Sequence, residues 1–352
     1  MKQEIKKFKE WVEANKEKKT AVIHDSDPDG LCSGVITALA LKRISGKIPL
    51  IFHQNPGEIT LTKHTINFLR ENFVEFVVTV DLSIDQRPES VKETEEFAKI
   101  LVLDHHKTYT DLNSSRTLMI KSQDLTGEEG SKYPVSKLSF DLFSELTDLQ
   151  DLDWISSIGL LGDNAYSHWK DFVDRVTEKY GIEKKELQKA TQLMDSIEVM
   201  DYSKLKDLIQ VMLTAKKPVD LMKKDLLTEL AEMEKEVGFW LEKFESQKEV
   251  FPEKELIYFE IKPAKHSIKS VIINRISEKL KDKTVIVLQD FGVDHVYFSA
   301  RRQDFKVKVN DLLEKSIEGI PDSMAGGHVP AAAGKIPREF KEQFKKQLIE
   351  NA

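Results

Sequence analysis

The chain has 352 residues, of which 40% are apolar and 32% are charged. This length fits two domains of ordinary size, and the composition excludes a disordered protein. No apolar run approaches the roughly 20 residues that a bilayer-spanning helix needs, and residues 1–19 lack the apolar centre of a signal peptide, so we expect a cytoplasmic protein. The single cysteine, Cys32, excludes an internal disulfide and a zinc site built from several thiolates.

The net charge of -7 argues against a protein that coats nucleic acid through bulk electrostatics. The charge is unevenly divided, however. Residues 251–352 carry 18 basic and 15 acidic side chains. The first 250 residues carry 35 basic and 45 acidic side chains. This division favours carboxylates that hold cations in the first part of the chain and basic side chains that hold an anion in the second.

In chain order, the first part alternates between short apolar strands and helical patterns. Residues 1–19 predict an amphipathic helix. The strands expected next run through TAVIHD, EFVVTVDLS and KILVLDHH, and helices are expected at 33–47 and across DWISSIGLLGDNAY. Short buried strands separated by helices predict a parallel sheet with helices on its faces.

The second part begins after a long helical stretch at 183–248. Strands are expected again at ELIYFEI, TVIVLQDF and DHVYFSARR, with a helix at SVIINRISEKL and a final helix at the C-terminus. We therefore predict an α/β fold: a parallel-sheet domain at 1–200, a helical linker at 201–250, and a smaller α/β domain at 251–352.

The first candidate site is the loop that follows the TAVIHD strand. Asp25, Asp27 and Asp29 occupy alternate positions of an Asp-Ser-Asp-Pro-Asp-Gly sequence, and neighbouring carboxylates repel one another unless cations lie between them. Such loops bind hard divalent metals through oxygen. When the motif is taken alone, a helix N-cap or an Asp-rich surface turn is the better explanation of the same residues.

Further acidic and imidazole groups follow the next buried elements. Asp81 ends one strand, Asp104-His105-His106 ends another, and Asp163 lies in an otherwise apolar helix. Carboxylates beside imidazoles supply a mixed ligand set that suits manganese, iron or zinc. Open parallel sheets place their ligand sites just beyond the carboxyl ends of the strands, so these groups are expected to meet.

The order of these motifs, DSDPDG, TVD, LDHH and GLLGD, resembles that of the DHH phosphoesterase superfamily. The second half resembles the DHH-associated domain of the RecJ and nanoRNase branches, through FSARR and the Gly326-Gly327-His328 motif with its following AAAG. The resemblance covers almost the whole chain and is closest to a minimal, archaeal-type RecJ-like or nanoRNase-like enzyme. Family II pyrophosphatases share the first domain but lack the GGH motif.

The resemblance implies a site for two Mn²⁺ ions, with Mg²⁺ or Co²⁺ as possible substitutes. Asp25 and Asp27 would hold one ion, and Asp81 would be shared between both. Asp29, His105 and Asp163 would hold the other, with Asp104 in the same cluster. The family histidine of the first motif falls one residue from His24, so the ligand there is either His24 or Asp25. His106 would contact the scissile phosphate.

The second domain would then bind the substrate. The resemblance assigns this role to Arg301, Gly326, Gly327 and His328, and a surrounding basic groove is expected from Lys265, Lys269, Arg302, Lys306 and Lys308.

We therefore expect a metal-dependent phosphodiesterase, an exonuclease that releases mononucleotides from single-stranded DNA or from short RNA or DNA oligonucleotides. A homodimer and a replication or repair partner are possible, and no membrane is expected. Two alternatives are a phosphohydrolase of small nucleotides (cyclic or linear dinucleotides, or 3′-phosphoadenosine 5′-phosphate) and a replication scaffold without catalysis.

Overall fold

The computed structural model describes residues 2–263 and 265–352, and it divides into two compact units, one ending at Glu229 and one from Leu230 to Ala352. Each unit has its own sheet and its own apolar core. The α/β architecture predicted for both halves is confirmed. Within the described ranges, none of the helices combines the length and the apolar character that crossing a membrane requires.

The first unit is built on a five-stranded sheet in which every strand pair is parallel. Its spatial order is β2-β1-β3-β4-β5. The strands are β1 (Thr20–His24), β2 (Leu50–His53), β3 (Phe76–Val80), β4 (Lys99–Asp104) and β5 (Thr117–Lys121). The chain leaves β1 for β2 on one side and returns to β3 on the other, so the strand order reverses between β1 and β3.

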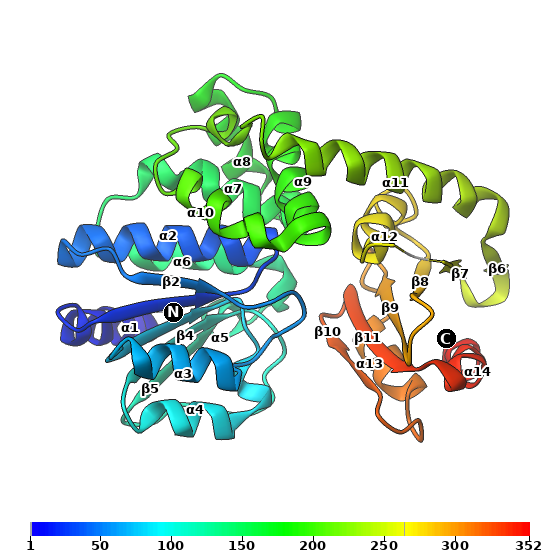
Figure 1. Ribbon diagram of the computed structural model, residues 1–352, viewed down its shortest axis with the longest axis horizontal. Coiled ribbons are helices and arrows are strands. Elements are labelled where there is room, and N and C mark those ends of the chain that lie inside the picture. Colours follow the sequence, from blue (N-terminus) through cyan, green and yellow to red (C-terminus); the bar gives the residue numbers. More distant parts are fainter. Residues whose placement is uncertain (1, 264) are drawn as a thin grey trace. The chain divides into compact units, whose positions relative to one another are not determined.

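Helices cover both faces of this sheet. The helices of this unit are α1 (Lys2–Asn15), α2 (Pro28–Ser45), α3 (Lys63–Glu71), α4 (Pro88–Glu95), α5 (Ser122–Thr126), α6 (Val135–Ser144), α7 (Asp153–Gly162), α8 (Lys170–Tyr180), α9 (Lys184–Asp201) and α10 (Leu205–Met212). Figure 1 shows α3 and α4 on one face and α2 and α6 on the other. The apolar side chains of the first face join one core with those of β1, β3 and β4. Burial on both faces explains why the strands read as continuous apolar runs rather than as alternating patterns.

The second unit holds a mixed six-stranded sheet in the order β10-β11-β9-β8-β7-β6. Its strands are β6 (Glu249–Phe251), β7 (Leu256–Ile261), β8 (Thr284–Asp290), β9 (His295–Arg301), β10 (Met324–Gly327) and β11 (Ala331–Pro337). Its helices are α12 (Lys269–Ser277), α13 (Val309–Ser316) and α14 (Lys341–Asn351). Phe298 of β9 stacks on Phe344 of α14 with ring centroids 4.4 Å apart, which anchors the last helix to the sheet.

The helical segment expected between the two sheets is present. Its main element is α11 (Leu227–Gln247), a helix of 21 residues that contains the boundary between the two units. Met233, Val237 and Trp240 of this helix are buried, and they follow the three- and four-residue spacing of an amphipathic helix.

Candidate metal centre

The acidic motifs of the first unit gather at the carboxyl edge of its sheet. Asp25 follows β1, Asp81 follows β3, and Asp104 ends β4 directly before His105. β1 and β3 flank the point where the strand order reverses, which is where open parallel sheets bind ligands. The fold therefore brings together side chains that lie up to 80 residues apart in the chain.

The Asp-Ser-Asp-Pro-Asp-Gly loop is also a helix start. Asp27 is the N-cap of α2, and its carboxylate accepts a hydrogen bond from Gly30 N at 2.8 Å. Gly30 has no space for a side chain, because a Cβ would lie 2.6 Å from the carbonyl oxygen of Asp25. The loop therefore caps a helix and also lies beside the group of Asp29, Asp81, Asp104, His105, His106 and Asp163, which we call the metal-type cluster.

Asp29 belongs to the first turn of α2, and its carboxylate faces the first residues of a second helix, α6. Its two carboxylate oxygens accept hydrogen bonds from Val135 N at 2.6 Å and from Ser136 N at 3.1 Å. Burial and the neighbouring charge of Asp163 nevertheless raise the pKa of Asp29 to about 7. Two amide donors thus do not offset the cost of a buried carboxylate beside another one.

The Nε2 atom of His105 faces two carboxylates. A backbone carbonyl can only accept, so the contact of His105 Nδ1 with Gly130 O at 3.2 Å assigns the proton to Nδ1. Burial and the charge of His106 lower the pKa of His105, which favours the neutral ring. His105 Nε2 then carries a lone pair, and it lies 3.2 Å from Asp81 Oδ1 and 3.4 Å from Asp163 Oδ2.

Asp81 is both strained and buried. Its φ is 60°, in the left-handed region that residues with a side chain seldom adopt. Its side chain is 2% exposed. Burial, together with the charges of Asp27 and Asp29, raises its pKa well above the usual range. Strain held at a buried carboxylate is characteristic of functional sites.

These contacts fit a bound cation. Carboxylate oxygens of Asp81 and Asp163 lie 3.2 and 3.4 Å from His105 Nε2, and in their ionised forms they repel its lone pair unless a cation lies between them. Two overlapping groups of close ligand atoms occur in the first unit, Asp29-Asp81-His105 and Asp81-Asp104-His106, and Asp81 belongs to both. The hydrogen bond from His105 Nδ1 to a carbonyl is the arrangement that orients metal-binding histidines.

Asp104 has a different set of partners. Its Oδ1 accepts hydrogen bonds from His105 N at 2.8 Å, His106 N at 3.2 Å and His106 Nδ1 at 2.8 Å. Its Oδ2 lies 2.9 Å from the ammonium of Lys121. Although burial works in the opposite direction, the neighbouring His106 and Lys121 hold the pKa of Asp104 well below its usual range.

The two candidates for the first-motif ligand, His24 and Asp25, differ in their surroundings. His24 is fully buried, its Nδ1 donates to the carbonyl of Asp25 at 2.6 Å, and its ring lies so near Gly34 of α2 that a Cβ there would be 2.6 Å from it. Burial and the nearby His53 lower its pKa to about 4. Asp25 takes part in the electrostatics of the cluster, because it contributes to the raised pKa of Asp81.

Two residues near the cluster carried no signal in the sequence. Glu198 of α9 accepts a hydrogen bond from Ser26 Oγ at 2.8 Å and adds to the raised pKa of Asp25, after the larger effects of burial and Asp27. Lys121 ends β5 beside Asp104. Both residues come from segments far along the chain, so only the tertiary fold brings them to the site.

The substrate-binding residues expected in the second domain lie on β9 and at the end of β10, the two strands that flank β11. Arg301 ends β9 and pairs with Ala331 of β11, while Gly327 pairs with Ala332. Gly327 has a φ of 136°, and a Cβ there would lie 2.5 Å from the oxygen of Ala331. The Gly326-Gly327-His328 motif is therefore the end of β10 and the start of the turn into β11, as a glycine pair at a close backbone approach predicts.

The guanidinium of Arg301 is fixed in orientation. Its Nε donates to Asn274 Oδ1 at 2.9 Å, and its Nη1 donates to the carbonyl of Ala300 at 2.9 Å. The expectation that Arg302 extends a basic groove is wrong. The Arg302 side chain, directly after β9, is 1% exposed and forms ion pairs with Glu255 and Asp304 at 2.7 Å, so its charge is already paired.

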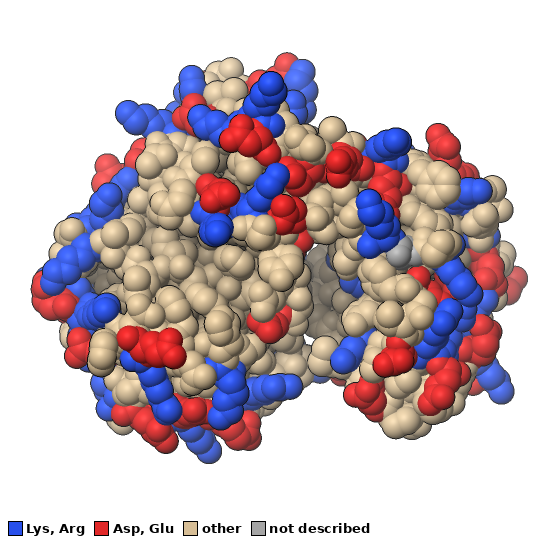
Figure 2. Space-filling model, in the orientation of Figure 1, with Lys and Arg blue, Asp and Glu red and all other residues tan. Residues whose placement is uncertain are grey.

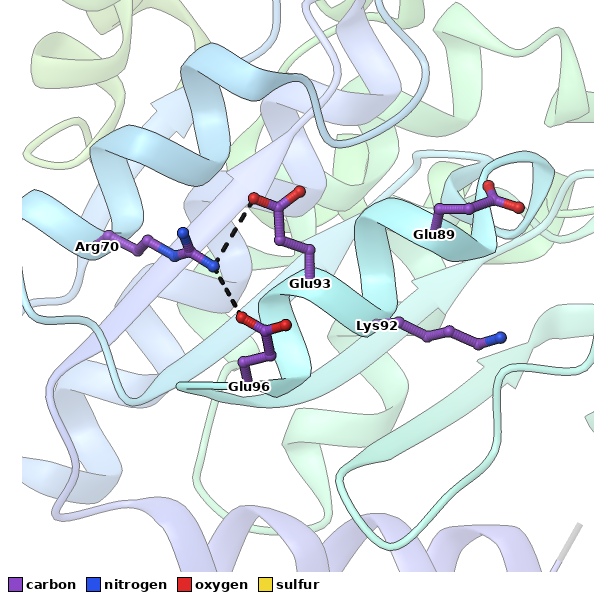
Figure 3. A pocket seen from close by; sticks show the side chains of 5 residues that line it. All are labelled: Arg70, Glu89, Lys92, Glu93 and Glu96. Atoms are coloured by element: carbon purple, nitrogen blue, oxygen red, sulfur yellow. Dashed lines mark hydrogen bonds and ion pairs between the residues drawn. The ribbon is translucent and has the colours of Figure 1, made fainter.

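A shallow hollow on the outside of the first unit is lined by Arg70, Glu89, Lys92, Glu93 and Glu96 of α3, α4 and the residue after α4. Figure 3 shows the guanidinium of Arg70 between two carboxylates, at 3.7 Å from Glu93 and 3.1 Å from Glu96. The charges of Arg70, Glu93 and Glu96 are therefore paired with one another. Since no residue of the acidic motifs lines this hollow, it is separate from the candidate metal centre.

Comparison with known families gives two matches that follow each other along the chain. Residues 19–149 match the DHH family, N-terminal domain, and residues 254–352 match the DHHA1 domain. The chain belongs to the DHH phosphoesterase superfamily. The acidic motifs described above fall within the first match, except for Asp163, and the Arg301 and GGH segments fall within the second. A comparison with curated proteins gives no match.

Several solved structures share this RecJ-like DHH fold. A DHH-domain protein described as a member of a family of ribosomal proteins has a TM-score of 0.78 at 14% identity, with 99% of this chain and 90% of that chain covered. RecJ from Thermus thermophilus in complex with Mn²⁺ has a TM-score of 0.68 at 15% identity, with 98% and 53% covered. CDC45 from Entamoeba histolytica has a TM-score of 0.55 at 10% identity, with 99% of each chain covered. At these identities the likeness is one of fold.

Proposed function

We propose that this DHH protein is a divalent-metal phosphodiesterase that releases mononucleotides from the ends of single-stranded DNA or of short RNA or DNA oligonucleotides. The observation that carries the proposal is the convergence of His105 Nε2 with carboxylate oxygens of Asp81 and Asp163. A largely buried set of converging acceptors is suited to a cation, and phosphodiester hydrolysis is the chemistry of this superfamily.

In this proposal two Mn²⁺ ions are bound, with Mg²⁺ or Co²⁺ as substitutes, because mixed imidazole and carboxylate ligands suit manganese. Asp81 serves both ions. Asp25 and Asp27 would hold one of them, and Asp29, His105 and Asp163 the other. Bound there, the ions supply Lewis acidity and a nucleophile at neutral pH.

The protein's own groups hold the substrate around that centre. His106 directs Nδ1–H to Asp104, so its Nε2 is the atom that, when protonated, donates to a phosphate oxygen. Arg301 offers a planar guanidinium whose orientation is fixed by Asn274, a geometry that suits a phosphate. Backbone amides at Gly326 and Gly327 and the ring of His328 complete the proposed phosphate and sugar contacts.

The fold likeness to a manganese-bound structure named exonuclease RecJ, with a TM-score of 0.64 at 16% identity, supports exonuclease activity on a nucleic acid. The fold likeness to CDC45 raises the alternative of a scaffold without catalysis. The electrostatics disfavour that alternative, because burial and mutual repulsion destabilise the charged forms of Asp25 and Asp81. A protein that binds no metal gains nothing from such a cluster.

The test is an assay of product length. Chelator-treated protein is incubated with Mn²⁺ and with DNA or RNA of 2 to 20 nucleotides, labelled at the 5′ or the 3′ end. The proposal predicts stepwise mononucleotide release that Asp81→Asn abolishes. Cleavage of dinucleotides alone supports the small-nucleotide alternative, and no cleavage of any substrate with Mn²⁺, Mg²⁺ or Co²⁺ contradicts phosphodiesterase activity.

A further inference from the structure

Lys121 is a buried ammonium surrounded by oxygens directly behind the metal-type cluster. Its side chain is 0% exposed, and its Nζ lies 2.9 Å from Asp104 Oδ2 and 3.1 Å from Asp85 Oδ2. The same Nζ donates to the backbone carbonyls of His106 at 3.1 Å and Lys107 at 3.0 Å. Three protons thus serve four oxygens, two from carboxylates and two from the loop that carries the DHH motif.

Each of these contacts acts on the position of His106. The carboxylate of Asp104 is held from one side by Lys121, and from the other it accepts the Nδ1–H of His106 at 2.8 Å. The carbonyl of His106 is held by Lys121 and by the amide of Gln123 at 2.8 Å. Both the ring and the backbone of His106 are therefore anchored through the same ammonium.

Asp85 extends this anchoring further along the loop. Its Oδ2, which pairs with Lys121, also accepts a hydrogen bond from Tyr109 N at 2.8 Å. Lys121 and Asp85 together hold the loop at residues 106, 107 and 109. An ordinary loop on a sheet edge is mobile, and this one is tied at three backbone positions to buried charges.

We propose that Lys121 is a positioning residue of the phosphodiesterase site: its buried ammonium holds the carboxylate of Asp104 and the backbone carbonyl of His106 in place, so that the His106 ring keeps Nδ1 toward Asp104 and Nε2 toward the substrate. The role of His106 toward the substrate rests on the proposed function. The arrangement of Lys121, Asp85, Asp104 and His106 does not, so it can be tested in the metal-free protein.

The test uses the full-length chain and the variant Lys121→Met, which keeps a long side chain and removes the charge. Imidazole ¹⁵N spectra of the metal-free protein report the tautomer of each of its nine histidines, and the signals of His106 are assigned by their absence in His106→Gln. Wild type should show a single Nδ1–H form for His106. Lys121→Met should show a mixture of both tautomers and, with Mn²⁺ and a labelled oligonucleotide, a kcat lower by about 10- to 100-fold with KM within about threefold.

A matched control separates positioning from the general loss of a buried lysine. Lys137 of α6 is also buried, at 6% exposure, and pairs with Asp141 at 2.5 Å. Its ammonium lies over the rings of Trp169 and Phe172, and none of these groups touches His106. Lys137→Met should leave the tautomer of His106 and the kcat unchanged. An equal loss in Lys137→Met overturns the proposal.

A rescue variant covers the case in which Lys121→Met does not fold. Removing the ammonium alone leaves Asp85 and Asp104 as two buried charges with no counter-ion. Lys121→Met with Asp85→Asn removes one of them, while the substituted amide retains an acceptor for Tyr109 N, so stability and part of the tautomer preference should return. A folded Lys121→Met or double variant with an unchanged His106 spectrum and unchanged kcat overturns the proposal. If the wild type hydrolyses no oligonucleotide, the proposed function fails while the metal-free spectra still decide the role of Lys121.

Discussion

At the scale of single residues, the site is defined by carboxylates placed where their charge is costly. Asp29 is fully buried and its pKa is about 7 because burial and Asp163 disfavour its ionised form. The pKa values of Asp25 and Asp81 are also raised, with burial as the main cause. Such a cluster lowers stability unless a cation compensates it, and this links the metal content of the protein to its stability.

The link gives a pH prediction for the metal-free protein. An acid with a higher pKa in the folded chain than in the unfolded chain, where it is about 3.9, binds more protons when folded. Its stabilising contribution is complete below about pH 4 and is lost as the pH rises through about 7. Calorimetry after chelation should therefore show a melting temperature that falls between pH 5 and pH 8, less steeply in Asp29→Asn, and that rises when Mn²⁺ is added. The same slope in both proteins and no response to Mn²⁺ would contradict the linkage.

A second prediction concerns Asp81 and His105, the two proposed metal ligands that follow strands. Asp81→Ala and His105→Ala should each lower the turnover of oligonucleotides at least about 10³-fold, because each removes charge stabilisation at the reacting phosphate. Both residues follow strands and lie outside the apolar core, so circular dichroism should report a folded protein. Turnover at the wild-type rate in either variant removes that residue from the mechanism.

At the scale of elements, glycines set the positions of the functional side chains. Gly130 allows the loop before α6 to pass against His105, since a Cβ there would lie 1.8 Å from the His105 carbonyl oxygen. The same glycine supplies the carbonyl that holds His105 Nδ1. By contrast, Gly238 of α11 has open space around its Cα.

The two glycines give opposite predictions. Gly130→Ala should displace His105, with a loss of about 10- to 100-fold in metal affinity and a fall of about 1–3 kcal/mol in the free energy of unfolding. Gly238→Ala should raise that free energy by about 1 kcal/mol, because alanine is the better helix former. Urea unfolding and metal titration measure both effects. Unchanged metal affinity in Gly130→Ala shows that the close approach does not position His105.

The sequence predicts the elements that have strong apolar patterns and misses those shaped by tertiary contacts. β3 and β4 were expected because each is a buried run that ends in an aspartate. β2 and β5 were not expected. β2 is short and only partly buried, and β5 ends in a lysine whose burial depends on Asp85 and Asp104. β11 consists largely of alanine and glycine, so its strand conformation comes from pairing with β9 and β10.

The sequence predicts the helices around the site but places two of their boundaries incorrectly. The expected start of the first-site helix at Ser33 is wrong, because Asp27 caps α2 and Pro28 begins it. The acidic loop and the helix start are one feature. Asp163 was expected inside a helix and instead follows its last residue, Gly162, as the C-cap. The sequence predicts that the acidic motifs meet, because the carboxyl ends of parallel strands lie at one edge of a sheet. It does not predict that Lys121 lies beside Asp104 or Glu198 beside Asp25, since these contacts depend on the tertiary structure.

At the scale of the whole molecule, the two units carry different chemistry. The metal-type cluster lies wholly in the first unit, and Arg301 and the GGH motif lie in the second. On the face that Figure 2 shows, basic and acidic side chains are interspersed over both units. Attraction of a polyanion by bulk charge is therefore a weak explanation for substrate binding, and specific groups such as Arg301 are the stronger one.

This division of labour predicts the effect of Arg301→Ala. If Arg301 contacts a phosphate equally in the ground state and the transition state, its loss should raise KM more than it lowers kcat. A charged hydrogen bond of about 1.5–3 kcal/mol corresponds to a factor of about 10 to 150. Steady-state kinetics on a trinucleotide and a 20-mer measure the split, and Arg302→Met, which removes a buried ion pair of the same unit, controls for stability. A change in kcat alone would place Arg301 in the chemical step.

The central claim is that the acceptors of Asp81, His105 and Asp163 converge because divalent ions bind there. Calorimetric titration of the chelator-treated protein with Mn²⁺ tests this claim most directly. The account predicts a stoichiometry approaching two ions per chain in the wild type and a clear reduction in Asp81→Asn, whose substituted residue would serve both ions. No binding of Mn²⁺, or binding that Asp81→Asn leaves unchanged, would contradict it.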